Sequence, residues 1–191
     1  MAQLDLVVVG YARDESDDCS RVQSTIVLVR AHPHVIVIDP GMVADRADLL
    51  RRLVDLGVAP ADVTDIVCSH QHLDHTLNVG LFPAAVVHDY AAEYDRDGWR
   101  QRPAEGLQLA PGVTLLHTPG HTAEDVTTLV ETADGLVACT HLWWSSEGPA
   151  DDPYAPDRAQ LRQQRERVLG RTTRIVPGHG APFTAGPSTP T

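Results

Sequence analysis

Short runs of hydrophobic residues recur along most of the chain, and they predict many β-strands and few helices. Leu4–Val9 is one such run and stops at Gly10. Val22–Arg30 and Val35–Asp39 are rich in β-branched residues and are separated by a proline-containing turn, so we predict a hairpin there. The polar and acidic stretch Tyr11–Arg21 is predicted to be a loop.

Two segments have the spacing of an amphipathic helix. In Asp45–Leu56, leucines recur three and four positions apart, and Gly57 follows as a stop signal. Arg158–Leu169 is the second predicted helix. Further strands are predicted at Val63–Cys68, Ala84–His88, Leu107–Leu109, Val113–His117, Thr127–Glu131, Leu136–Cys139 and Arg174–Val176, with irregular structure at Tyr90–Arg102 and Leu142–Pro156.

This pattern of strands with interspersed helices predicts an α/β protein built in layers. No repeat, linker or low-complexity block divides the chain. We therefore expect one domain over residues 1–186 and a disordered tail at 187–191.

Composition narrows the function classes. The chain has 191 residues and a formal net charge of −11, with 15 basic residues that are all arginine. A strongly acidic chain is a poor general binder of nucleic acid or of a membrane surface, because both carry negative charge. No apolar run approaches the roughly 20 residues of a membrane span, and no signal segment is expected. Three cysteines do not suggest a disulfide framework, so we expect a cytoplasmic protein, with a homodimer left open.

Ten histidines are many for this length, and four ligand-type side chains fall within six residues. The segment runs His70-Gln71-His72-Leu73-Asp74-His75 directly after a predicted buried strand. Three imidazoles and a carboxylate buried together without a metal would be costly. Zinc is the expected metal, in one or two ions, and iron or manganese also suits this donor set.

Two more histidines follow predicted strands, each directly after a Pro-Gly pair. They are His121, in Pro119-Gly120-His121, and His179, in Pro177-Gly178-His179. Glycine lets the chain turn tightly, so each imidazole can be presented from a strand end. These two histidines strengthen the prediction of a metal site.

In this order, the three motifs resemble the metallo-β-lactamase superfamily over Val22 to Phe183. Segments 69–75, 80–83 and 177–183 are most similar to its group of small proteins called metallo-β-lactamase domain-containing protein 1. The resemblance implies an αβ/βα sandwich of four layers with a dinuclear metal site at one edge of the sheets. By that resemblance the first ion is held by His70, His72 and His121, and the second by Asp74, His75 and His179. It also implies that Asp39 supports the metal-binding loop.

The chain departs from the superfamily pattern after the strand Leu136–Cys139, where an aspartate usually bridges the two metals. Here the matching residues are Thr140 and His141. His141 is therefore either a terminal ligand of the second metal or no ligand. Loss of the bridging charge would weaken the second ion and leave a dinuclear site near +2, which favours anionic substrates.

We expect a metal-dependent hydrolase that attacks a small, anionic ester, lactone or thioester. A bound metal lowers the pKa of its water ligand toward about 7 and so supplies hydroxide at neutral pH. Asp74 would orient that hydroxide, and His141 or His179 would protonate the leaving group. The alternatives are a phosphodiesterase or ribonuclease of the same fold, and a non-catalytic metal-binding module disabled by His141.

For several other residues the sequence leaves two roles open. Trp143 and Trp144 either wall a substrate pocket or pack on the core. Arg158, Arg162 and Arg165 share a helical face, where they either grip an anion or form a solvated face paired with acids. Cys68 and Cys139 are expected to be buried, and His32, His34, His88 and His117 to be surface or strand residues.

Overall fold

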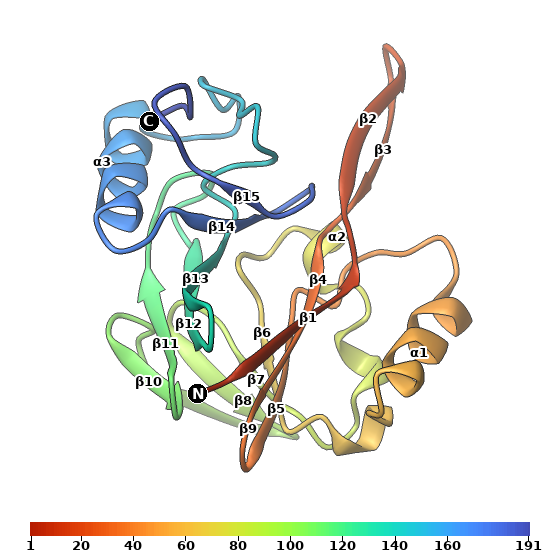
Figure 1. Ribbon diagram of the computed structural model, residues 1–191. Coiled ribbons are helices and arrows are strands. Elements are labelled where there is room, and N and C mark those ends of the chain that lie inside the picture. Colours follow the sequence, from red (N-terminus) through yellow and green to blue (C-terminus); the bar gives the residue numbers. More distant parts are fainter.

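Two β-sheets face each other, and each carries helices on its outer side (Figure 1). The computed structural model describes residues 1–191. The first sheet contains, in spatial order, β1 (Gln3–Val8), β4 (Ile26–Ala31), β5 (His34–Ile38), β6 (Asp65–Val67), β7 (Val86–His88), β8 (Ala92–Asp95) and β9 (Gly98–Gln101). The second contains β10 (Leu107–Ala110), β11 (Val113–His117), β12 (Val126–Thr132), β13 (Gly135–Thr140), β14 (Arg174–Pro177) and β15 (Phe183–Thr184). The four-layer α/β architecture is as predicted.

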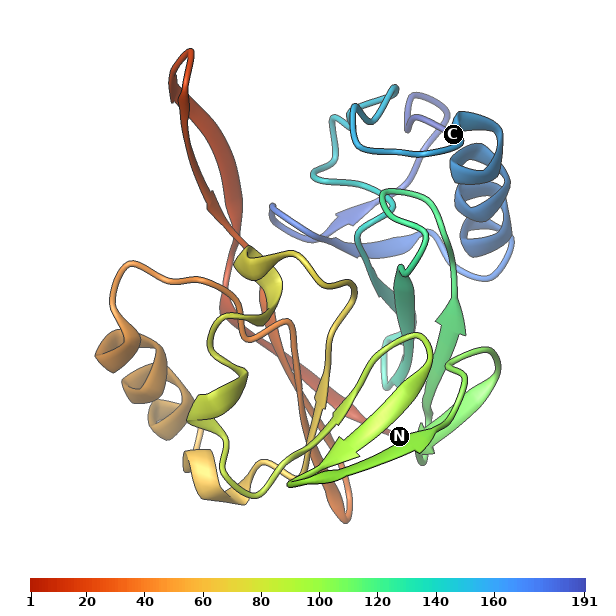
Figure 2. The ribbon, with the colours of Figure 1, turned by 180° about the vertical axis from the view of Figure 1, so that it is seen from behind.

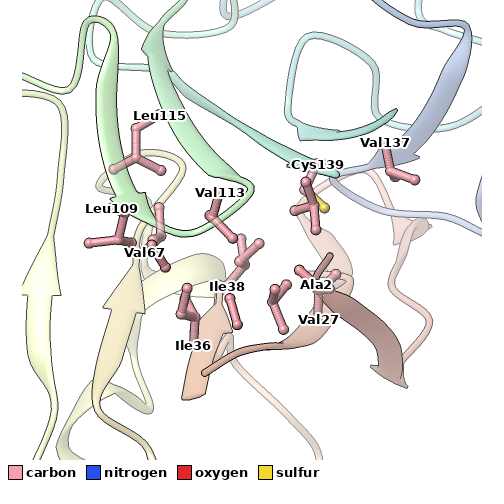
Figure 3. Packing of buried hydrophobic residues seen from close by; sticks show 14 of the residues in the cluster. Ala2, Val27, Ile36, Ile38, Val67, Leu109, Val113, Leu115, Val137 and Cys139 are labelled. Atoms are coloured by element: carbon pink, nitrogen blue, oxygen red, sulfur yellow. The ribbon is translucent and has the colours of Figure 1, made fainter. Parts of the chain in front are cut away.

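Alternating side chains of the strands build the layers. In β4, Val27 and Val29 point into the largest apolar cluster, which lies between the two sheets (Figure 3). Ile26 and Leu28 point the other way, toward the helix side. Since this strand is buried on both faces, it is a continuous apolar run in the sequence.

The two predicted helices begin and end close to their predicted limits, as α1 (Arg46–Asp55) and α3 (Arg158–Leu169). The short helix α2 (Leu73–Thr76) and the 3₁₀ turns η1 (Pro60–Asp62) and η2 (Val79–Leu81) were not predicted. Asp45 caps α1 by accepting a hydrogen bond from the Ala47 amide at 2.8 Å. Leu49 and Leu53 then pack against the first sheet, as their spacing predicts. No helix of the chain combines the length and the apolar character needed to cross a membrane.

The prediction of a loop at Tyr11–Arg21 is wrong, because the segment forms the hairpin β2 (Tyr11–Ser16) and β3 (Cys19–Gln23). The hairpin projects as a narrow arm from the sandwich, so both of its faces are polar (Figures 1 and 2). Cross-strand contacts stabilise it instead of a core: Ser20 Oγ donates to Asp14 Oδ1 at 2.7 Å. Val22–Arg30, predicted as one strand, is consequently divided between β3 and β4.

Irregular structure at Tyr90–Arg102 is likewise a wrong prediction, since β8 and β9 pair there. Glu93 of β8 forms ion pairs with Arg100 and Arg102. The segment lies at the edge of the first sheet, and its polar sequence conceals its strands. The short strand β15 was not predicted either.

Within residues 187–191, the Pro190 carbonyl accepts a hydrogen bond from Trp143 Nε1 at 2.8 Å. Disorder of this tail remains a prediction.

Candidate metal centre

All seven predicted ligands meet where strands of both sheets end. His70 follows β6, His121 follows β11, His141 follows β13 and His179 follows β14. The Val126 amide donates to the Ser69 carbonyl at 2.7 Å and so joins the loops of the two sheets.

The donor atoms form the two groups that the resemblance implies. One donor atom each from His70, His72 and His121 lie within 4.8 Å of one another, and so do those of Asp74, His75 and His179. His141 lies close to both groups, because its ring centroid is 4.6 Å from that of His70 and 4.8 Å from that of His75. It also belongs to two further groups of neighbouring donors, one with His70 and His75 and one with His121 and Asp152.

Asp39 fixes the first of the two loops. Its Oδ2 lies 2.8 Å from His75 Nδ1, and its Oδ1 accepts from the Ser69 amide at 2.7 Å. The Asp39 backbone has a φ of +49°, in the left-handed region that aspartate tolerates better than most residues. The expected support of the metal loop by Asp39 agrees with this geometry.

Asp152 fixes the second loop in the same way, and the sequence did not predict this role. Its Oδ2 accepts from Trp144 Nε1 at 2.8 Å and lies 2.8 Å from His121 Nδ1, while its Oδ1 accepts from the Tyr154 amide at 2.9 Å. Asp152 lies in an acidic loop far from His121 in sequence, so no local motif marks it.

Arg165 anchors the loop that contains Asp152, and neither of its two predicted roles describes this. It is fully buried on α3 and donates to the carbonyls of Leu142, Pro149 and Ala150. It binds no anion and lies on no solvated face. Arg158, by contrast, is exposed and pairs with Asp151 at 3.5 Å.

Each tryptophan matches a different one of the two predicted roles, core packing and a pocket wall. Trp143 is fully buried and packs in the core of the second sheet and α3. Trp144 stacks on Tyr154 with ring centroids 5.9 Å apart, and its ring is 5.8 Å from that of His121. Trp144 therefore forms a wall beside the histidines.

A cavity of about 700 Å³ opens onto the histidines. It is bounded by the β2–β3 arm, by the loop of Trp144 and Tyr154, and by the start of α2. The lining residues are Ala12, Arg13, Asp14, Ser20, Val22, His72, Leu73, Asp74, His121, Trp144, Pro153, Tyr154 and His179. The arm that sequence analysis predicted as a loop is thus one wall of the cavity.

Burial strongly affects the titration of several of these histidines. It lowers the pKa of His70 and of His141 well below the ordinary value, and it lowers the pKa of His179 to about 4. These rings are therefore neutral at pH 7, which is the form that binds a metal.

Without a bound metal, His75 and Asp74 carry opposite charges at neutral pH, and a metal ion at His75 Nε2 would displace its proton. Burial opposes the charge on His75, but the carboxylates of Asp39 and Asp74 outweigh it and raise the pKa of His75 to about 9. Burial likewise opposes ionisation of Asp74, but the neighbouring His75 outweighs it and lowers the Asp74 pKa to about 2.

The donor set fits a divalent metal ion. The Nε2 atoms of His70 and His75 and the Nδ1 atom of His141 are buried without any hydrogen-bond partner. Such unsatisfied buried atoms are rare in proteins, and metal coordination satisfies them. Gly178 permits the close approach of His141, because a Cβ at this position would lie 2.3 Å from His141 Cδ2.

Cys68 and Cys139 are buried as predicted, and burial raises the pKa of both thiols. His88 is also buried, and with His34 it contacts the Asp65 carboxylate, at 2.9 and 2.7 Å. This His34–Asp65–His88 cluster belongs to the first sheet and has no part in the candidate metal centre.

Comparison with known proteins gives a consistent result. The family model of the metallo-beta-lactamase superfamily matches residues 19–181. The chain is 32% identical to metallo-beta-lactamase domain-containing protein 1 of Xenopus laevis, covering 93% of this chain and 79% of the frog protein. The human protein of that name is 40% identical over 78% of this chain, and the match spans only 59% of its length.

An N-acyl homoserine lactonase of Bacillus cereus is 33% identical, over 65% of this chain and 58% of its own. Among solved structures, a Thermotoga maritima protein of the metallo-beta-lactamase type superposes with a TM-score of 0.74 at 23% identity. That superposition covers 96% of this chain and 99% of the other. At this identity it bears on the fold alone.

Proposed function

The chain belongs to the metallo-beta-lactamase superfamily, and on that premise we propose that it is a metal-dependent hydrolase of a small ester, lactone or thioester. The observation that carries the proposal is the convergence of six histidines and Asp74, of which His72, Asp74, His121 and His179 line one cavity. The identity of the Bacillus cereus relative as a lactonase favours a cyclic or open-chain ester as the substrate class.

The fold implies divalent-metal binding, and we propose zinc, in one or two ions, as the metal. When bound, the metal supplies Lewis-acid activation of water and of the substrate carbonyl. His70, His72 and His121 would hold one ion and Asp74, His75 and His179 the other.

The hydrogen bonds of the ligand rings present their Nε2 lone pairs. His75 and His121 each direct Nδ1 at a carboxylate, and His179 directs Nδ1 at the Gln23 carbonyl at 3.0 Å. In the neutral ring the proton is then on Nδ1, and Nε2 is free to coordinate. For His179 this arrangement favours a ligand over the proton donor that the sequence suggested.

Asp74 is the group best placed to orient the attacking water. Its Oδ2 lies 3.4 Å from His75 Nε2 and 3.6 Å from His179 Nε2, and its low pKa keeps it ionised. An ionised carboxylate accepts a hydrogen bond from the water and so fixes its position.

The cavity walls suggest where the rest of the substrate lies. Leu73, Val22 and the stacked Trp144–Tyr154 pair offer apolar surface for an acyl or aryl group. A negative charge on the substrate remains a prediction, since the lining includes Arg13 but also Asp14 and Asp74.

The test is hydrolysis of an N-acyl homoserine lactone, an aryl ester and a thioester by the zinc-loaded protein. We expect turnover of at least one of them, its loss with chelator, and its loss in His70→Ala. His32→Ala, which alters an exposed histidine in the β4–β5 turn, is the matched control and should retain full activity. A fully metal-loaded protein that hydrolyses none of the three would overturn the proposal.

A further inference from the structure

The β2–β3 arm is attached to the sandwich through a short buried segment at its base (Figures 1 and 2). Gln23 is the last residue of β3, and Ser24 and Thr25 join it to β4; all three are at most 9% exposed. Residues 11–22 of the arm form hydrogen bonds only with one another. The contacts at the base therefore fix the position of the arm beside the cavity.

The hydroxyl of Thr25 joins this base to the loop that carries His179. Thr25 Oγ1 accepts from the Gly10 amide at 3.1 Å, directly before β2, and from the Gly180 amide at 3.1 Å. It donates to the Gly180 carbonyl at 3.0 Å, which completes the one donor and two acceptor positions of a hydroxyl. The Thr25 amide also donates to the Gly178 carbonyl at 2.7 Å. Thr25 thus holds the chain on both sides of His179.

The arm also contacts the His179 ring directly. The Gln23 carbonyl accepts from His179 Nδ1 at 3.0 Å. Both ends of the arm meet at this carbonyl, because a Cβ on Gly10 would lie 2.4 Å from the same oxygen. Next to it, Ser24 Oγ donates to the Asp39 carbonyl at 3.1 Å. The base of the arm and the ring of His179 are therefore one hydrogen-bonded unit.

We propose that Thr25 is a positioning residue that couples the β2–β3 arm to His179. Residues of both arm strands and His179 line the same cavity, so a substrate that contacts the arm also acts on the ligand ring through Thr25 and Gln23. Coupling between two sites is reciprocal, so a metal ion held by His179 in turn orders the arm. The inference rests on the metal binding of the proposed function but not on hydrolysis.

The first experiment measures zinc affinity by chelator competition in the natural protein, Thr25→Val and Thr25→Ser. Valine has nearly the shape of threonine but lacks the hydroxyl, whereas serine keeps it. Loss of a supporting contact typically weakens metal binding by about 10–100-fold, and we expect about tenfold in Thr25→Val. Thr25→Ser should stay within about twofold of the natural protein, because its hydroxyl can restore the contacts.

Thr172→Val is the matched control, because Thr172 precedes β14 at the end opposite His179. Its Oγ1 donates to the Leu136 carbonyl at 2.6 Å and accepts from the Arg174 amide at 3.0 Å. The substitution should lower stability to urea but change zinc affinity by less than about twofold. An equal loss of zinc affinity in Thr172→Val, or in Thr25→Ser, would overturn the role of the Thr25 hydroxyl.

Hydrogen exchange of backbone amides gives a readout on the unaltered protein, should Thr25→Val fail to fold. We expect zinc to slow exchange in residues 11–23 of the natural protein and of Thr25→Ser, and to leave it unchanged in Thr25→Val.

Unchanged zinc affinity in Thr25→Val would overturn the coupling and leave the proposed hydrolase intact. Slower exchange at residues 178–180 without any change in the arm would do the same. A protein that shows both expected effects but hydrolyses nothing would overturn the hydrolase alone, and a protein that binds no zinc would overturn both.

Discussion

The two halves of the sandwich each use one buried carboxylate to orient a metal-facing histidine, but they support that carboxylate differently. In the first half, Asp39 ends β5 and reaches His75 and the Ser69 amide directly. In the second half, Asp152 lies in a long loop and reaches His121 and Trp144, while Arg165 donates to the nearby carbonyls of Pro149 and Ala150.

The difference shows two ways to place a carboxylate against a metal-facing histidine. The first loop is short, follows a buried strand and needs one acid at a strand end. The second half has no such strand end for Asp152, so a helix behind the loop supplies three hydrogen bonds. The second loop also positions the stacked Trp144–Tyr154 pair that forms a wall of the cavity. Asp152 therefore supports both the metal-facing histidine and the cavity wall.

Arg165→Met should produce the largest effect, because it removes three hydrogen bonds from a fully buried guanidinium to backbone carbonyls. We expect the free energy of unfolding to fall by about 3 kcal/mol, measured by urea denaturation. Arg162→Met, an exposed neighbour on the same helix, should change it by less than about 0.5 kcal/mol. Equal effects of the two variants would show that Arg165 does not support the second loop.

Asp39→Asn and Asp152→Asn compare the two carboxylates directly. Loss of a ligand's carboxylate partner typically lowers metal affinity by about 10–100-fold. We expect that loss in both variants, but for different ions. Asp39→Asn should weaken the ion held with His75, and Asp152→Asn the ion held with His121.

Competition with a chelator of known affinity measures both losses, and Asp151→Asn serves as the control beside Asp152. Loss of the same ion in both variants would mean that the two carboxylates do not support separate ions.

The first half also has an acidic residue with a pH dependence of its own. Burial opposes ionisation of Asp65, but hydrogen bonds from His88, Thr64 and His34 outweigh it and lower its pKa. Its stabilisation is therefore complete above the unfolded pKa of about 3.9 and is lost as pH falls below that value.

Asp65→Asn should cost about 1–2 kcal/mol at pH 7 and flatten the fall in stability below pH 4. Thermal unfolding across pH 2.5–7, a range chosen to span roughly both pKa values, measures this slope. An unchanged slope of stability against pH would mean that another group causes most of the loss of stability in acid.

Trp144→Phe should have the smallest effect. It retains the stacking on Tyr154 but removes the indole N–H that Asp152 accepts, a hydrogen bond worth about 1 kcal/mol. Because Asp152 would then be held by one hydrogen bond fewer, we expect metal affinity to fall by no more than about fivefold. The same chelator competition measures it. A loss as large as that in Asp152→Asn would mean that Trp144, and not the carboxylate, positions His121.

The sequence predicted both long helices, most core strands and the six histidine and aspartate positions that match the superfamily motifs. Its errors lie in Tyr11–Arg21 and Tyr90–Arg102, where most strand residues are exposed. An amphipathic pattern arises only when one face contacts a core. The projecting arm and the sheet edge lack that contact, so cross-strand ion pairs and hydrogen bonds hold them without leaving a periodic signal.

Local pattern alone determined the ligand-rich loop, since His70 to His75 are adjacent in the chain and follow one strand. Only tertiary structure decided the partners that cross from one element to another. Asp152 meets His121, Arg165 meets the loop behind Trp144, and the ring of His141 lies beside those of His70 and His75. These contacts depend on how the two sheets stack, because stacking alone brings residues tens of positions apart within hydrogen-bond reach.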